Sequence, residues 1–200
     1  MSIQGQAKVL SKNEFKRVES MILNKSQSKR NLAILYFSFQ LGLRACEIRQ
    51  LKIGDILDSN GELTDTINLT KTKGNKYRTI YLTNKKLREV LLDHINSMKE
   101  FLIKKKIVFS PNIPLFRSQK GSFFHPVQIV MLFNRFFKDA GIDKAKSHSG
   151  RRTFVTNKIE EGINIKSIAT LVGHTSISMT AKYHDDNPNK LKKILEKGIF

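Results

Sequence analysis

One segment of the sequence is apolar on almost every face, and it restricts what the chain can fold into. Residues Asn31–Leu41 read NLAILYFSFQL, a pattern that predicts a helix buried on all sides. The run contains Ser38 and Gln40 and is shorter than the roughly 20 residues that a membrane-spanning helix needs. We therefore expect other amphipathic elements to surround this helix and Gly42 to end it.

Three further segments have the apolar spacing of helices that could cover the central one. A capping box at residues 11–14 (SKNE) begins the first, and the second extends from Asn84 to Lys104. The third begins at Pro126, a residue that suits the first position of a helix. We interpret the apolar stripe of this third helix as core rather than as a platform for stacking bases. That stripe consists of Val130, Phe133, Phe137 and Ala140.

Two short segments, residues 66–70 and 78–82, are rich in β-branched residues and predict a pair of strands. Residues 71–77 (KTKGNKY) contain a Gly-Asn pair and are predicted to form the tip of a hairpin. Residues 146–184 divide into three short helices, of which the last is expected to carry Tyr183. The predicted fold class is α+β and mainly α, a helical domain with one small antiparallel β-hairpin.

The length of 200 residues allows one domain. Residues 1–10 are expected to form a flexible N-terminal lead, residues 11–186 the domain, and residues 187–200 a C-terminal helix. That last helix either packs on its own chain or docks on a neighbouring subunit. The N-terminus lacks a signal-peptide pattern and Cys46 is the only cysteine, so we expect a cytoplasmic protein without an internal disulfide.

The charge balance is strongly positive. The chain has 36 Lys and Arg against 17 Asp and Glu, a formal net charge of +19. Such an excess usually indicates a polyanionic partner, most often nucleic acid. A general enrichment in lysine, as in proteins of AT-rich genomes, is the alternative explanation for the same number.

Four residues near the C-terminus have the chemistry to act on a phosphate. His148 and Arg151 are three positions apart, which places both on one face at the start of a helix. An arginine can hold two phosphate oxygens at once, and a neutral imidazole such as that of His148 or His174 can accept a proton. Tyr183 could then attack phosphorus. Each of these residues alone has an ordinary structural explanation, but the set suits cleavage of a phosphodiester.

The order and spacing of these residues resemble those of the tyrosine recombinases, also called phage integrases. Residues 41–47 (LGLRACE) are similar to the first motif of that family, and residues 148–151 (HSGR) to the second. Residues 171–174 (LVGH), with Tyr183 nine positions after the histidine, are similar to the third motif and its nucleophile. The resemblance extends over nearly the whole chain. It is that of a small single-domain member, without the N-terminal core-binding domain that most members have.

A fourth motif, residues 73–78 (KGNKYR), resembles the family's β-hairpin with its general acid. The resemblance implies six catalytic residues, which are Arg44, Lys73, His148, Arg151, His174 and the nucleophile Tyr183. Lys71 and Lys76 are close alternatives to Lys73 as the acid. Further DNA contacts are expected from Lys71, Lys76, Arg78 and Arg152. Gly150 departs from the family pattern and is expected to loosen the start of its helix.

The implied activity is site-specific DNA recombination through a 3′-phosphotyrosyl intermediate, without ATP, a metal or another cofactor. The implied partners are double-stranded DNA, further copies of the chain in a tetramer on DNA, and accessory DNA-bending proteins, but not a membrane. Two other activities remain open, that of a DNA-binding regulator without recombination and that of a type IB topoisomerase. The sequence leaves open the DNA site and whether exchange integrates, excises or inverts an element.

Overall fold

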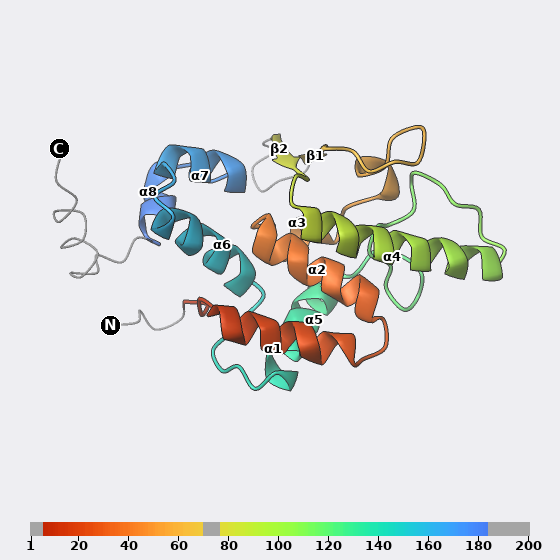
Figure 1. Ribbon diagram of the computed structural model, residues 1–200, viewed down its shortest axis with the longest axis horizontal. Helices are drawn as coiled ribbons and strands as arrows, with labels where there is room; N and C mark the ends of the chain where they lie inside the picture. The colour runs from red at the N-terminus through yellow and green to blue at the C-terminus, as the bar shows by residue number, and fades with distance from the viewer. Residues whose placement is uncertain (1–5, 70–76, 184–200) are drawn as a thin grey trace.

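The computed structural model describes residues 6–69 and 77–183, so the predicted C-terminal helix at 187–200 lies outside the described residues. The described chain is mainly helical with one two-stranded sheet (Figure 1), which confirms the predicted fold class. The elements are α1 Lys12–Leu23, α2 Ser28–Gln40, α3 Ala45–Ile48, the short 3-10 helix η1 Ile53–Asp55, β1 Thr66–Leu69, β2 Arg78–Tyr81, α4 Lys85–Lys104, α5 Pro126–Asp139, α6 Ser149–Glu160, α7 Ile165–Val172 and α8 Ile177–Ala181. None of these described helices has both the length and the apolar character that crossing a membrane requires.

The predicted central helix is confirmed as α2. All residues from Asn31 to Phe39 are buried, and α1, α4 and α6 pack against this helix. Figure 1 shows α2 lying between α1 and α4, with α6 near its C-terminal end. Packing from several sides removes apolar surface around the whole helix, so its nearly uniform apolar sequence is stabilising here. Gly42, with a φ of 63°, turns the chain away after α2 ends.

Local sequence determines where the flanking helices begin. The Ser11 hydroxyl accepts a hydrogen bond from the Glu14 N–H (3.2 Å), and the Glu14 carboxylate accepts one from the Ser11 N–H (2.9 Å). This capping box satisfies two donors that would otherwise lack partners. Pro126 is the first residue of α5. The buried members of the predicted α5 stripe are Phe133, Phe137 and Ala140. The prediction is wrong for Val130, whose side chain is 38% exposed.

The predicted hairpin is confirmed for its two strands. Strands β1 and β2 are antiparallel with Ile67 opposite Ile80, and both side chains are buried. Alternate residues of each strand are exposed, as expected for a sheet with one packed face. The three lysines of the predicted tip, Lys71, Lys73 and Lys76, lie outside the described residues.

Residues 6–10 do not form the flexible lead that the sequence predicted. Leu10 is only 4% exposed, and its N–H donates a hydrogen bond to the Thr153 hydroxyl (2.9 Å). The Arg152 guanidinium donates to the carbonyl of Ala7 (2.8 Å). These bonds fasten the segment to α6, because they satisfy backbone groups that packing removes from water.

The crossing of α2 and α6 depends on the absence of a side chain at Gly150. A Cβ atom there would lie 2.2 Å from the Ser38 hydroxyl and 2.8 Å from the Phe39 ring. Neither distance is possible without movement of one helix, so glycine permits the close contact. The expectation that Gly150 loosens the start of α6 is therefore wrong. The residue instead holds His148 and Arg151 against the C-terminal end of α2.

Candidate active site

Tertiary packing brings the described candidate residues to one end of the molecule. His148 and Arg151 lie at the start of α6, and Arg44 directly precedes α3. His174 follows the C-cap of α7. Helix α6 packs on α2 and α7, and α7 packs on α8 and β2. Figure 1 shows α6, α7 and α8 grouped together at this end.

Tyr183 lies beyond the helix that was predicted to carry it. Helix α8 ends at Ala181, and the Tyr183 N–H donates to the carbonyl of Thr180 (3.0 Å) in the following turn. The Tyr183 ring stacks on the His174 ring, with centroids 5.9 Å apart and planes inclined by 8°. The Arg152 guanidinium lies 6.0 Å from the same tyrosine centroid. The candidate nucleophile is thus in contact with an imidazole and a guanidinium.

The carboxylate of Glu47 joins two of the arginines. Its oxygens accept hydrogen bonds from Arg44 Nη1 (3.0 Å), from Arg78 Nη1 (2.9 Å) and from Arg78 Nη2 (2.8 Å). Glu47 also accepts from the backbone N–H of Arg44 (2.8 Å), which fixes the start of α3. Burial by itself raises the pKa of Glu47, but Arg78 and Arg44 outweigh burial and hold that pKa below 4.5. Glu47 is therefore charged at neutral pH.

The carbonyl of Val172, at the C-terminus of α7, is a second acceptor that holds the arginines in place. It accepts hydrogen bonds from Arg78 Nη1 (2.7 Å) and from Arg151 Nη2. Arg151 Nη1 donates to the carbonyl of Gly42 (2.9 Å). Guanidinium groups suit the end of a helix, where carbonyls lack intrahelical partners and the dipole is negative. The two arginines thus fix α7 relative to β2 and to the end of α2.

Gly173 directs the chain from this anchored helix end to His174. It has a φ of 64°, and a Cβ atom there would lie 2.7 Å from Arg78 Nη1. Glycine adopts this left-handed conformation without the strain that other residues suffer. Both the backbone conformation and the position of Arg78 therefore require glycine immediately before His174.

Arg78, from which a DNA contact was expected, is directed into the protein, and the DNA contact itself stays a prediction. Its side chain is 6% exposed, and its guanidinium is occupied by Glu47 and the carbonyl of Val172. Arg78 is a structural residue that connects the β-hairpin to the site. Of the other expected DNA contacts, Arg152 lies at the site beside Tyr183, whereas Lys71 and Lys76 lie outside the described residues.

The buried groups carry an excess of positive charge. Three arginines meet here, Arg44, Arg78 and Arg151. Among the described residues that bond to them, Glu47 is the only one with a negative charge, which leaves two net positive charges. Burial lowers the pKa of Arg151 to about 9, and the charge of Arg44 acts in the same direction. Arg151 is still protonated at neutral pH. An uncompensated buried charge is unfavourable, so an anion such as phosphate would relieve this excess on binding.

The two candidate catalytic histidines, His148 and His174, are neutral at neutral pH. Burial lowers the pKa of His174 to about 4, with Arg151, Arg44 and Arg78 adding to the shift. Burial also lowers the pKa of His148, and Arg151 and Arg44 act in the same direction. A neutral imidazole has one N–H donor and one acceptor nitrogen. Each histidine can therefore accept a proton on one ring nitrogen, which makes the ring an imidazolium, or donate a hydrogen bond from the other nitrogen while it stays neutral.

Thr180 orients His174 and was missed by the sequence analysis. Its side chain is fully buried, and its hydroxyl lies 2.7 Å from His174 Nδ1. Within the described part of the chain, this hydroxyl has no other hydrogen-bond partner. If it donates to Nδ1, the ring proton stays on Nε2, which can then donate to a bound anion. The six-residue spacing from His174 was the only sequence signal available.

A cavity opens beside these groups. It is lined by Tyr183, His148, Arg151 and Arg152, together with Val130 and Asn134 of α5. Lys146 and Lys182 also line it, so the cavity presents the candidate nucleophile, a neutral imidazole and four cationic residues to one space. That combination suits a phosphate ester whose oxygens are held while the phenol attacks phosphorus.

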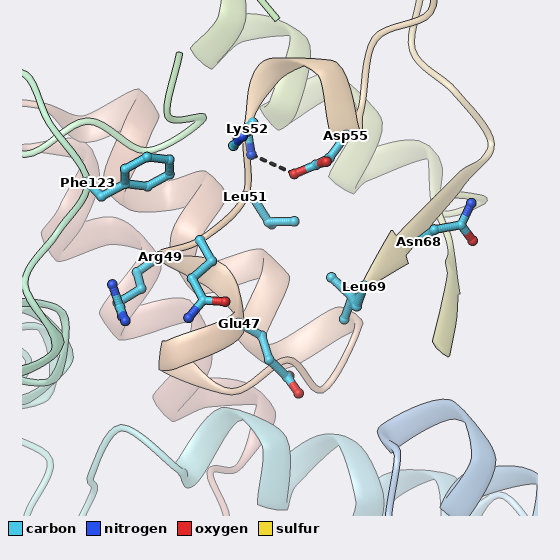
Figure 2. A pocket seen from close by; sticks show the side chains of 9 residues that line it. Glu47, Arg49, Leu51, Lys52, Asp55, Asn68, Leu69 and Phe123 are labelled. Atoms are coloured by element: carbon cyan, nitrogen blue, oxygen red, sulfur yellow. Dashed lines mark hydrogen bonds between the residues drawn. The ribbon is translucent and has the colours of Figure 1, made fainter. Parts of the chain in front are cut away.

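A second cleft lies on the other side of α3. Figure 2 shows Lys52 and Asp55 at one end of it and Glu47 at the other, with the Glu47 side chain directed away from them. None of the described catalytic candidates lines this cleft. Glu47 lines this cleft, but its hydrogen bonds are with Arg44 and Arg78.

Comparison with known proteins gives consistent matches over most of the chain. The sequence model described as the phage integrase family matches residues 8–190. A tyrosine recombinase of Pseudothermotoga lettingae is 30% identical over 172 residues, which cover 84% of this chain and 54% of that protein. The chain spans about half the length of the curated relatives it matches.

Solved structures match the fold. The crystal structure of XerA recombinase has a TM-score of 0.73 at 24% identity and covers 100% of this chain and 67% of that chain. A XerH site-specific recombinase bound to its difH substrate has a TM-score of 0.70 at 24% identity. That match covers 98% of this chain and 56% of the XerH chain. The helical arrangement and the small sheet are therefore those of recombinase catalytic domains.

The first testable prediction concerns the charge on Glu47. In Glu47→Gln, Arg78 loses its buried partner charge, and we expect the free energy of unfolding to fall by about 3 kcal/mol at neutral pH. Because the folded-state pKa of Glu47 is lowered, this contribution is present above pH 4.5 and is lost as the pH falls further. Urea unfolding of both proteins across this range measures it. Glu89→Gln, at an exposed position, is the control, and a pH-independent difference would contradict the assignment.

The second prediction concerns the proton on His174. We expect the Nε2–H form to dominate in the wild type and in Thr180→Ser, because the hydroxyl donates to Nδ1 in both. Thr180→Val has a similar shape but no hydroxyl, so we expect a mixture of the two neutral forms. Nitrogen chemical shifts of the imidazole, measured by NMR, distinguish these forms. An unchanged ratio in the valine variant would show that Thr180 does not set the tautomer.

Proposed function

Because the chain belongs to the phage integrase family, we propose that it is a site-specific DNA recombinase. It breaks and rejoins DNA strands through a covalent bond between Tyr183 and a 3′-phosphate. One observation carries the proposal, the convergence of Tyr183, His148, Arg151 and Arg152 on one cavity. A protein that only binds DNA needs cations at its surface, but it has no need of a phenol placed against a neutral imidazole.

The first chemical step is attack of the Tyr183 oxygen on the scissile phosphorus. The phenolic proton passes to the neutral His148, since an unassisted tyrosine is a poor nucleophile. A bond forms between the phenolic oxygen and phosphorus, and the bond from phosphorus to the 5′-oxygen breaks. Lys73 donates a proton to that leaving oxygen. A 5′-hydroxyl from a partner strand reverses each transfer, so the sequence of steps consumes no high-energy cofactor.

The arginines stabilise the charge that accumulates on the non-bridging oxygens. Arg44 and Arg151 supply cations that are held in place before the substrate arrives. His174 donates a hydrogen bond from Nε2, with its ring held by Thr180. Groups that are already oriented need no reorganisation during the reaction, which makes this form of stabilisation effective.

The wider assembly follows from the same chemistry. Residues 11–186 form the catalytic domain, and double-stranded DNA, which the net charge of +19 attracts, is the substrate. Four copies on two DNA duplexes supply the four strand cleavages of a complete exchange. The segment at 187–200 docks on the neighbouring copy, and accessory DNA-bending proteins assist the assembly. The protein acts on DNA in the cytoplasm.

The third prediction tests the nucleophile. The chain is incubated with a pool of random-sequence duplexes that each carry one nick, and DNA attached to denatured protein is collected. We expect the wild type to trap adducts and Tyr183→Phe to trap none while it still binds DNA. Tyr81→Phe is the matched control, because Tyr81 is 55% exposed on β2. Adducts that persist in Tyr183→Phe would refute the proposal.

The fourth prediction identifies the general acid among Lys71, Lys73 and Lys76. Replacement of the bridging 5′-oxygen by sulfur creates a leaving group that needs no proton, because thiols ionise near pH ~8.5. We expect Lys73→Ala to slow cleavage of the oxygen substrate by about 100-fold or more and to leave the sulfur substrate unaffected. The Lys71→Ala and Lys76→Ala variants are the matched controls. If one of them shows this pattern, the acid is that lysine and the assignment of Lys73 is wrong.

A further inference from the structure

Helix α5 has one face that the rest of the described chain does not cover. Its buried side contains Ile129, Phe133, Phe136 and Phe137. On the opposite side, Val127 is 56% exposed, Val130 38% and Met131 59%. Asn134 and Lys138 are also exposed. The exposed positions follow one another by three or four residues, so they form a continuous stripe along the helix.

This stripe is continuous with the candidate active site. Val130 and Asn134 line the same cavity as His148, Arg151 and Tyr183. Whatever ligand places a phosphate against Tyr183 therefore also lies next to the exposed face of α5. A DNA duplex is large enough to contact both at once.

The charge and length of the face suit DNA. Arg135 and Lys138 are exposed on α5, whereas its one carboxylate, Asp139, forms an ion pair with Lys25. Residues 127–138 extend over about 18 Å, which corresponds to roughly five base-pair steps. The major groove of B-form DNA is about 12 Å wide and admits an α-helix.

The side chains on the face match one kind of base pair. The thymine methyl group is the only apolar group on the major-groove edges of the bases, and valine and methionine can pack against it. An asparagine can form two hydrogen bonds with the N6 and N7 atoms of adenine. Asn134 is free to do so, because its side chain has no hydrogen bond within residues 6–69 and 77–183. Apolar residues and asparagine thus read the two halves of the same A·T pair.

We propose that the exposed face of α5 lies in the major groove beside the scissile phosphate and selects A·T pairs there. Val127, Val130 and Met131 pack against thymine methyl groups, and Asn134 pairs with an adenine. The proposal rests on the proposed recombinase function and adds a base preference to it. It also explains why large apolar side chains remain exposed next to a strongly cationic site, since the groove removes them from water on binding.

The test uses the full chain and the pool of nicked random duplexes described above. Adducts are sequenced, and the cleavage position aligns the selected sequences. We expect A·T pairs to be enriched in the base pairs adjoining the cleaved phosphate. The enriched duplex is then synthesised with thymine and, one position at a time, with uracil, which lacks only the C5-methyl group.

Loss of a single contacted methyl group should weaken wild-type binding by about fourfold. At the position that Met131 contacts, replacement of thymine by uracil should not change the binding of Met131→Ala. Asn134→Ala should lose about tenfold of its preference for adenine at one position. The matched control is Ile103→Ala, because Ile103 is a 77% exposed residue on α4, outside the cavity, and should retain the full effect of uracil.

The possible outcomes separate this proposal from the function on which it rests. If no Tyr183-dependent adduct forms, the recombinase function fails. If adducts form without A·T enrichment, or if uracil has the same effect in Met131→Ala as in the wild type, the assignment of α5 is overturned. If the α5 variants alter self-association and leave base preference unchanged, the face is an interface between copies of the chain and the proposal is wrong.

Discussion

The buried carboxylate of Glu47 is the interaction on which the site depends. It binds Arg44 directly, fixes the start of α3, and holds Arg78 of β2 against the C-terminus of α7. Arg44 and the distant strand β2 therefore share one negative charge, and α7 is attached to this pair through Arg78. Removal of one member from such a buried set leaves its partners charged and unpaired, which is more costly than loss of the contact itself. The fold and the cationic site are for this reason stabilised together.

The same network accounts for the electrostatic character of the cavity. One carboxylate binds two guanidinium groups, and the third, that of Arg151, bonds to the carbonyls of Gly42 and Val172. The site therefore keeps an excess of positive charge before any ligand is present. That excess lowers the pKa values of His148 and His174 beyond the effect of burial and keeps both rings neutral. Fixed cations can hold a phosphate, and a neutral imidazole beside them can accept a proton from a phenol. The geometry thus supports phosphoryl transfer to tyrosine without a change in the protonation of the arginines.

Much of the local structure was predictable, because it is determined by neighbours in the sequence. The central helix follows from a run of apolar residues, α1 from a capping box, and the hairpin from two β-branched segments. The limits of such patterns appear where long-range contacts decide. Val130 belongs to an apolar stripe but lies on the open side of α5. Leu10 precedes the first helix, yet it is buried because residues 6–10 bond to α6.

The sequence by itself determined the class of fold and the set of residues that could act on a phosphate, since both are written in residue types and their spacing. Only the tertiary structure decided how those residues are used. It joined Arg78 to Glu47, placed Gly150 where α2 and α6 cross closely, and set the Thr180 hydroxyl against His174. The physical reason is that the roles of Arg78 and Gly150 depend on contacts between segments far apart in the chain, and spacing along the sequence contains no information on such contacts. The contact of Thr180 with His174 depends on the turn between α7 and α8, whose geometry only the structure gives.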